Sequence, residues 1–107
     1  MNVLIYDGPG IANLQKPLIK AIKKCLGNCY DVIPVDHQTL NTQPWQESTK
    51  LLIMPGGRDL LFLESLDKAG GLKKIADWVR ENNGKYLGIC GGSYFACSRI
   101  GLYYFHH

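Results

Sequence analysis

The chain has 107 residues, of which 46% are hydrophobic and 20% charged, and its formal net charge is +3 at pH 7. This composition is typical of one small globular domain and excludes a disordered chain. Much of the positive charge lies on four lysines of one predicted helix, which is typical of a solvated helix face. A nucleic-acid surface would need interleaved aromatic residues or a longer basic stripe, so we expect no nucleic-acid partner. No apolar run approaches the roughly 20 residues that span a bilayer, and no membrane association is expected.

The cysteines and the first residues of the chain indicate its compartment. The four cysteines show no metal-ligand spacing, so we expect neither a metal nor another cofactor. Residues 1–7 lack the basic region and cleavage site of a secretory signal peptide and instead predict a strand. A cytoplasmic location with mainly free thiols follows. Cys25 and Cys29 are predicted to be small buried thiols.

Four apolar runs predict strands, at residues 3–6, 30–35, 50–54 and 86–89. The second run contains Pro34, which cannot donate a ladder hydrogen bond and therefore predicts an edge strand. Predicted helices alternate with these strands, at residues 14–26, 60–66, about 72–81 and about 92–100. Residues 36–47 are predicted to be a loop with one helical turn. This alternation indicates a parallel α/β sheet that is covered on both faces.

Two of the predicted helices have a clear apolar face. The first follows Asn13, which is a suitable N-cap, and tolerates Pro17 in its first turn. Its predicted buried face consists of Leu14, Leu18, Ala21, Ile22, Cys25 and Leu26. The later helix is predicted to bury Leu72, Ile75, Ala76 and Val79, and to end at the Asn-Asn-Gly run of residues 82–84.

Residues 88–92 read Gly-Ile-Cys-Gly-Gly and follow the last predicted strand directly. This pattern is the thiol version of a nucleophile elbow, a sharp strand-to-helix turn that exposes the nucleophile between glycines. The N-terminus of the following helix would favour the thiolate of Cys90, and the N–H of Gly91 could help to stabilise an oxyanion. The alternative is a buried structural cysteine at a glycine-rich turn.

Two more glycine loops follow predicted strands, at residues 7–10 and 55–59. In a parallel sheet the carboxyl ends of the strands meet at one edge, where ligand sites collect. Asp7, Arg58 and Asp59 could instead have a local role in their own turns, rather than contact a ligand. Ser93 and Tyr94, which follow the elbow, could instead cap the helix. The residues expected to contact a ligand are Asp7, Gly8, Gly10, Gly56, Arg58, Asp59, Ser93 and Tyr94.

The combination of these three loops resembles the class I glutamine-amidotransferase-like superfamily. The resemblance implies a flavodoxin-like, three-layer α/β/α fold with a mainly parallel sheet. In that superfamily the glycine loop after the third strand supplies an oxyanion-hole N–H, and the elbow cysteine attacks the substrate carbonyl. Carried over to this chain, the resemblance implies Cys90 as the nucleophile and the N–H groups of Gly57 and Gly91 as oxyanion donors.

A closer resemblance is to the N-terminal domain of eukaryotic biotin–protein ligases, over residues 1 to about 99. The segments that carry it are residues 1–10, 42–45, 54–60 and 88–95. The superfamily domain usually continues past the elbow to a His-x-Glu pair, so residues 1–107 are expected to form a single domain that is shortened at its C-terminus. The ligase module itself, with its glycine-rich loop and catalytic lysine, has no counterpart here, and biotin ligation is not carried over.

Catalysis would require a base for the cysteine, and three histidines are candidates. His37 follows an edge strand, and His106 and His107 follow the elbow helix, so none is expected to reach Cys90. This favours a binding or regulatory module, which acts beside a ligase, over a working enzyme. A cysteine-dependent amidase or hydrolase and a structural assembly domain remain the alternatives. The corresponding partners are a small amide or carboxylate ligand, a biotin-ligase module, or a second copy of the chain.

Overall fold

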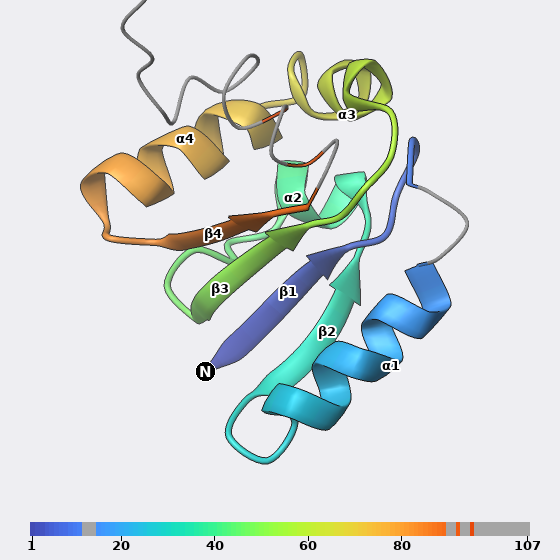
Figure 1. Cartoon of the computed structure of the whole chain (residues 1–107). Coiled ribbons are helices and arrows are strands. Elements are labelled where there is room, and N and C mark those ends of the chain that lie inside the picture. The colour runs from blue at the N-terminus through green and yellow to red at the C-terminus, as the bar shows by residue number, and fades with distance from the viewer. Residues whose placement is uncertain (12–14, 90–91, 93–94, 96–107) are drawn as a thin grey trace, which may run out of the picture.

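In the computed structural model, which describes residues 1–11, 15–89, 92 and 95, four parallel strands form one sheet (Figure 1). The strands are β1 (Asn2–Tyr6), β2 (Asp31–Val35), β3 (Thr49–Met54) and β4 (Lys85–Gly88). Their order across the sheet is β2-β1-β3-β4. This order and the parallel pairing agree with the α/β class and with a flavodoxin-like arrangement.

The position of each strand follows from its residues. β1 lies between β2 and β3, and its Val3 to Tyr6 run is buried on both faces. β2 pairs only with β1 among the described strands, with Pro34 opposite Ile5. The edge position predicted from Pro34 is therefore confirmed.

One face of the sheet is covered by α1 (Gln15–Leu26). Its buried side is rotated relative to the prediction, since Ala21 and Cys25 are exposed and Ile19 faces the sheet instead. Gln15 lies on this side as well: its side chain is buried and donates from Nε2 to the carbonyl oxygen of Tyr6 at 2.5 Å. The helix residues that pack on Val3, Ile5 and Ile53 are Leu18, Ile19, Ile22 and Leu26.

The prediction that Cys25 and Cys29 are buried is wrong. Both are free and exposed, in the last turn of α1 and in the connection to β2. The rotation of α1 turns Cys25 to solvent, and the connection that holds Cys29 runs over the surface. Asn13 and Leu14, the predicted start of this helix, lie outside the described residues.

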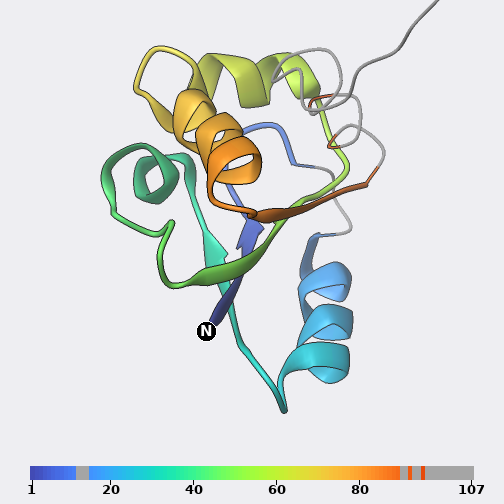
Figure 2. The same cartoon turned by 90° about the vertical axis from the view of Figure 1, so that its left-hand side faces the viewer.

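Three helices cover the other face: α2 (His37–Thr42), α3 (Asp59–Leu66) and α4 (Gly71–Glu81) (Figure 2). α2 is longer than the single turn predicted, because Asp36 caps its N-terminus and Leu40 is fully buried in the core. The predicted face of α4 is confirmed, with Ile75 and Ala76 buried and Leu72 and Val79 packed against the core. The largest cluster combines Leu4, Tyr6, Leu52 and Met54 with these helices.

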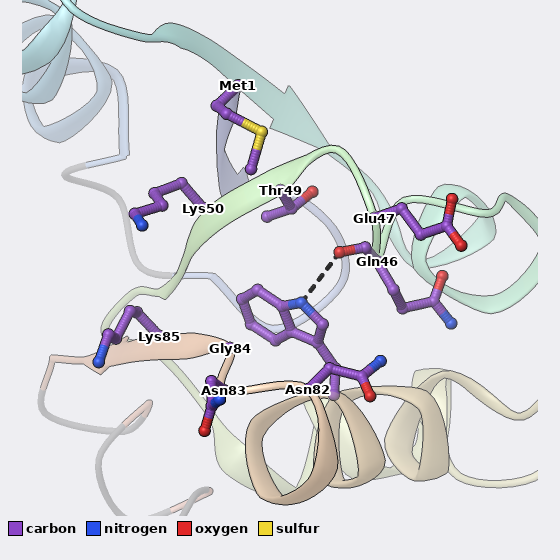
Figure 3. Close-up of a pocket in the computed structure, with 10 residues that line it drawn as sticks. Met1, Gln46, Glu47, Thr49, Lys50, Asn82, Asn83, Gly84 and Lys85 are labelled. Carbon is purple, nitrogen blue, oxygen red and sulfur yellow. Dashed lines mark hydrogen bonds between the residues drawn. The ribbon is translucent and has the colours of Figure 1, made fainter.

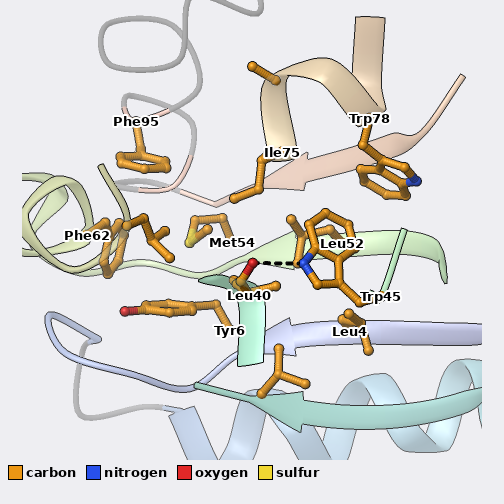
Figure 4. Close-up of a cluster of buried hydrophobic side chains, with 13 residues drawn as sticks. Leu4, Tyr6, Leu40, Trp45, Leu52, Met54, Phe62, Ile75, Trp78 and Phe95 are labelled. Carbon is orange, nitrogen blue, oxygen red and sulfur yellow. Dashed lines mark hydrogen bonds between the residues drawn. The ribbon is translucent and has the colours of Figure 1, made fainter. Parts of the chain in front are cut away.

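Two tryptophans anchor this layer (Figure 4). The rings of Trp45 and Trp78 meet edge to face, with centroids 5.2 Å apart and planes at 74°. Both rings are buried, and each indole N–H donates to a backbone carbonyl at 3.0 Å, that of Leu40 and that of Gln46 respectively. Because both polar atoms are satisfied, the two rings contribute apolar burial without a desolvation penalty.

The cap of α2 gives a pH-dependent prediction. The carboxylate of Asp36 accepts from the N–H of Thr39 at 2.9 Å, and this hydrogen bond lowers the pKa of Asp36. We expect Asp36→Ala to lower the free energy of unfolding at pH 7 by about 0.5–1 kcal/mol. The contribution of the charge is present above the unfolded Asp pKa, near 3.9, and is lost as the pH falls through the lower folded pKa.

Urea unfolding at pH 7 and pH 3 measures this effect, with Asp36→Asn as the matched control. Asparagine keeps a neutral cap acceptor, so its loss relative to wild type should be smaller than that of alanine. An alanine variant that is as stable as wild type at pH 7 would show that the cap does not contribute.

Candidate functional site

The glycine loops that follow β1 and β3 are joined to each other. Ile11 and Gly57 form an isolated antiparallel bridge, and the N–H of Arg58 donates to the carbonyl oxygen of Gly10 at 2.8 Å. The two loops predicted to meet at the carboxyl edge of the sheet therefore lie in direct contact. Their backbones, rather than their side chains, fix this contact.

Gly57 is the residue at which these loops approach most closely. Its φ of 155° is one that L side chains rarely adopt, and a Cβ there would collide with the carbonyl oxygen of Gly10. The inter-loop hydrogen bond is donated by Arg58, and the N–H of Gly57 has no acceptor among the described residues. Within the described part of the chain, this N–H is thus an unused donor at the carboxyl edge.

The elbow itself can be placed only from its flanks, because Cys90, Gly91, Ser93 and Tyr94 lie outside the described residues. On one side, the N–H of Ile89 donates to the carbonyl oxygen of Met54 at 3.0 Å. On the other, the N–H of Gly92 donates to the carbonyl oxygen of Ile89 at 2.9 Å, and its carbonyl accepts from the Tyr86 hydroxyl at 2.7 Å.

Gly92 also packs directly on the end of β3. A Cβ on Gly92 would collide with the carbonyl oxygen of Met54 and would lie 3.0 Å from that of Pro55. Pro55 begins the loop that contains Gly57. Gly92 therefore lies beside the start of this loop.

A row of three buried aromatic rings packs beneath the loops after β1 and β3 and the segment after β4 (Figure 4). Phe62 of α3 meets Tyr6 edge to face at 5.3 Å on one side and Phe95 at 5.6 Å on the other. All three rings are fully buried. The row connects the end of β1 and the segment after β4 through α3, so it holds the loops of the site on one rigid base.

Tyr6 contributes a hydrogen bond as well as its ring. Its hydroxyl donates to the carbonyl oxygen of Pro9 at 3.2 Å. Burial raises the pKa of Tyr6 to about 12, with a smaller opposing effect of Ser65. The phenol is therefore a neutral donor at physiological pH and fixes the loop after β1.

The remaining predicted contacts lie on the same two loops. The side chains of Asp7 and Arg58 are exposed, and neither forms an ion pair within the described part of the chain. Gly8 lies against the Tyr6 ring, and Gly56 is half-buried beside Gly57. Backbone positions place Asp59 at the first residue of α3. The structure thus brings together the loop residues of the predicted site without pairing their charges.

The strand order separates the described histidine from the elbow. His37 follows β2, whereas the elbow follows β4, and β1 and β3 lie between them. At about 4.8 Å per strand the two positions are roughly 14 Å apart. His37 is therefore too far to act as a base for Cys90, although its Nδ1 is buried and has no partner among the described residues. His106 and His107 lie outside the described residues.

Sequence reasoning missed two residues that shape this edge. Gln15 bonds the last carbonyl of β1, and Phe62 links the two sides of the site. The only sequence signal for Gln15 was a polar residue on the apolar stripe of its helix. Phe62 had the pattern of an ordinary core residue.

Neither a membrane segment nor a metal cluster is found among the described residues. None of their helices is long and apolar enough to cross a bilayer. Within the same residues, no group of three or more histidine, cysteine or acidic side chains could hold a metal ion.

Comparison with known proteins gives a consistent result. A family model described as "Biotin-protein ligase, N terminal" matches residues 1–104. A biotin–protein ligase of Schizosaccharomyces pombe is 41% identical over 103 residues, which are 94% of this chain and 16% of that protein. A Chlamydia muridarum protein described as uncharacterized is 44% identical over 71 residues, 65% of this chain and 27% of that protein. The chain thus spans about a sixth and about a quarter of the length of these relatives.

Proposed function

The chain belongs to the biotin-protein ligase N-terminal family, and from this premise we propose that it is a binding and regulatory domain. Its site is the carboxyl edge of the sheet, and its ligand is a small molecule with an amide or carboxylate group. The ligase beside which it acts is proposed from the relative in Schizosaccharomyces pombe. The class I glutamine-amidotransferase-like assignment is part of the same proposal.

The observation that carries this proposal is the N–H of Gly57, which has no acceptor among residues 1–11, 15–89, 92 and 95. It is fixed by the pairing of Gly10 with Arg58, and it lies on the loop against which Gly92 packs. A fixed, unpaired backbone N–H is suited to an oxygen of a carboxylate or amide, because binding requires little further ordering of the loop. Asp7 and Arg58 are exposed on the same loops and supply charge near it.

Binding without turnover is favoured because the described residues supply no base. His37 lies at the far edge of the sheet from the elbow. A cysteine without a base that is itself oriented by a third group makes a poor amidase. The ligand would therefore bind and leave unchanged.

Backbone amide NMR of the full chain tests the binding. With acetamide and acetate as probes, we expect the Gly57 and Gly10 N–H resonances to shift with saturation at millimolar concentration. The Gly70 N–H serves as the control, because it lies between α3 and α4, away from this edge. Equal shifts at Gly57 and Gly70, or none at either, would contradict the site.

The regulatory role is tested on the relative that is described as a ligase. We expect the probe that saturates Gly57 in this chain to change the rate of biotin ligation by the Schizosaccharomyces pombe protein at least twofold. An unchanged rate would contradict a regulatory role but not the binding site itself.

A cysteine-dependent amidase is the second candidate, and one observation favours it. Gly57 lies on the loop that begins at Pro55, against which Gly92 packs, and its N–H could donate to an oxyanion formed by attack of Cys90. Ammonia release from L-glutamine distinguishes the two functions. Turnover that Cys90→Ala abolishes would establish the amidase and overturn the binding-only proposal.

A further inference from the structure

A pocket lies at the edge of the sheet opposite the candidate site, where β3 and β4 begin (Figure 3). It has a volume of about 450 Å³, which is within the usual range for small-molecule sites. Its walls are the starts of the two strands, the segment after α4 and the segment before β3. The pocket is thus separated from the carboxyl-edge site by the length of the strands, roughly 15 Å.

Opposite charges lie on the two sides of this pocket. Figure 3 shows the ammonium groups of Lys50 and Lys85 on one side of the pocket and the carboxylate of Glu47 on the other. All three side chains are exposed, and none of them forms an ion pair in the part of the chain that the structure describes. The pocket therefore offers one cationic end and one anionic end, both available to a ligand.

One wall of the pocket is fixed by hydrogen bonds. Trp78 lines it, and its indole N–H is already bonded to the carbonyl oxygen of Gln46 at 3.0 Å. Gly84 packs directly on this indole, and the N–H of Gly84 donates to the Trp78 carbonyl at 3.0 Å. Trp78 is 2% exposed, so its indole holds this wall in place but offers almost no surface to a ligand.

From the charges on its two sides we infer that the amino-edge pocket binds a small zwitterion, with a carboxylate at Lys50 and Lys85 and an ammonium at Glu47. A simple anion would be repelled by Glu47, and a simple cation by the two lysines. At about 30 Å³ for each water-sized group, a 450 Å³ pocket holds a ligand of about 10–15 non-hydrogen atoms. A short ω-amino acid fits within this volume and carries both charges.

Three probes of matched length test the inference with the full chain: 6-aminohexanoate, hexanoate and hexylamine. The readouts are the indole N–H resonance of Trp78 and the backbone N–H of Gly84. We expect 6-aminohexanoate to shift both with a dissociation constant at least fivefold lower than either singly charged probe. Equal affinities for the three probes, or no shift at 50 mM, would overturn the inference.

Variants that remove one charge show which group of the ligand binds at each end of the pocket. We expect Lys85→Gln to weaken 6-aminohexanoate and hexanoate but not hexylamine, and Glu47→Gln to weaken 6-aminohexanoate and hexylamine but not hexanoate. Lys20→Gln, an exposed lysine on α1, is the control for a change of net charge and should leave all affinities unchanged. A loss of affinity in the Lys20 variant as large as that in the Lys85 variant would indicate non-specific electrostatics and overturn the site.

Discussion

Replacing Phe62 with alanine is expected to lower the free energy of unfolding by about 3–5 kcal/mol. The side chain is fully buried and forms edge-to-face contacts with Tyr6 and Phe95, at 5.3 and 5.6 Å. Alanine removes the ring and leaves a cavity between two rings that belong to opposite ends of the chain. Because small domains have a free energy of unfolding of only about 5–15 kcal/mol, the variant should be close to unfolded.

Leu60→Ala is the matched control on the same helix. Leu60 is 55% exposed, so its truncation should change the free energy of unfolding by less than about 1 kcal/mol. Urea unfolding followed by tryptophan fluorescence measures both variants, since Trp45 and Trp78 are buried in the native state. Similar losses for the two variants would show that the aromatic row is not a main source of stability.

The same substitution should also loosen the elbow before the chain unfolds. Phe95 would lose the ring that holds it, and Phe95 lies three residues after Gly92, the glycine that packs on Met54. Hydrogen exchange at the N–H of Ile89 and Gly92 should therefore accelerate more than exchange at the N–H of Ile5 in the centre of the sheet.

The strands could be predicted because their residues leave few alternatives. Val3 to Tyr6 and Leu52 to Met54 are buried on both faces and are continuous apolar runs in the sequence. Pro34 placed its strand at an edge because the chemistry of proline is local. Parallel pairing then brought the carboxyl ends of β1, β3 and β4 to one edge without further information.

The rotation of α1 and the length of α2 could not be predicted, since both depend on tertiary contacts. Six residues between 14 and 26 had the pattern of one apolar face, but in the folded chain Gln15 is buried and bonded to Tyr6, whereas Cys25 is exposed. Likewise, α2 is stabilised by the burial of Leu40, which the polar sequence around it conceals.

The candidate site was likewise predictable only in part. That two glycine loops would share an edge followed from the strand pattern, whereas the bridge between Ile11 and Gly57 did not. Such a bridge depends on how two loops far apart in the sequence meet. The sequence could predict where Gly57 lies, but not that its N–H is left without an acceptor among the described residues.

Gly57→Ala is expected to abolish the response of the carboxyl edge to acetamide, with at least a tenfold loss of affinity. The new Cβ would collide with the carbonyl oxygen of Gly10, and a φ of 155° is strained for alanine. The loop must move, which breaks the 2.8 Å hydrogen bond from Arg58 to Gly10 and misdirects the Gly57 N–H. Strain of this kind should also lower the free energy of unfolding by about 1–3 kcal/mol.

Gly70→Ala separates the effect on the site from backbone strain. Gly70 also has a positive φ, of 99°, but a Cβ there meets nothing within 4 Å. Its variant should lose about 1 kcal/mol of stability and should bind acetamide as wild type does. Amide NMR titration of both variants with acetamide distinguishes the two explanations. If backbone strain alone were the cause, both variants would lose affinity equally. A site that uses the Gly57 N–H predicts a loss only in Gly57→Ala.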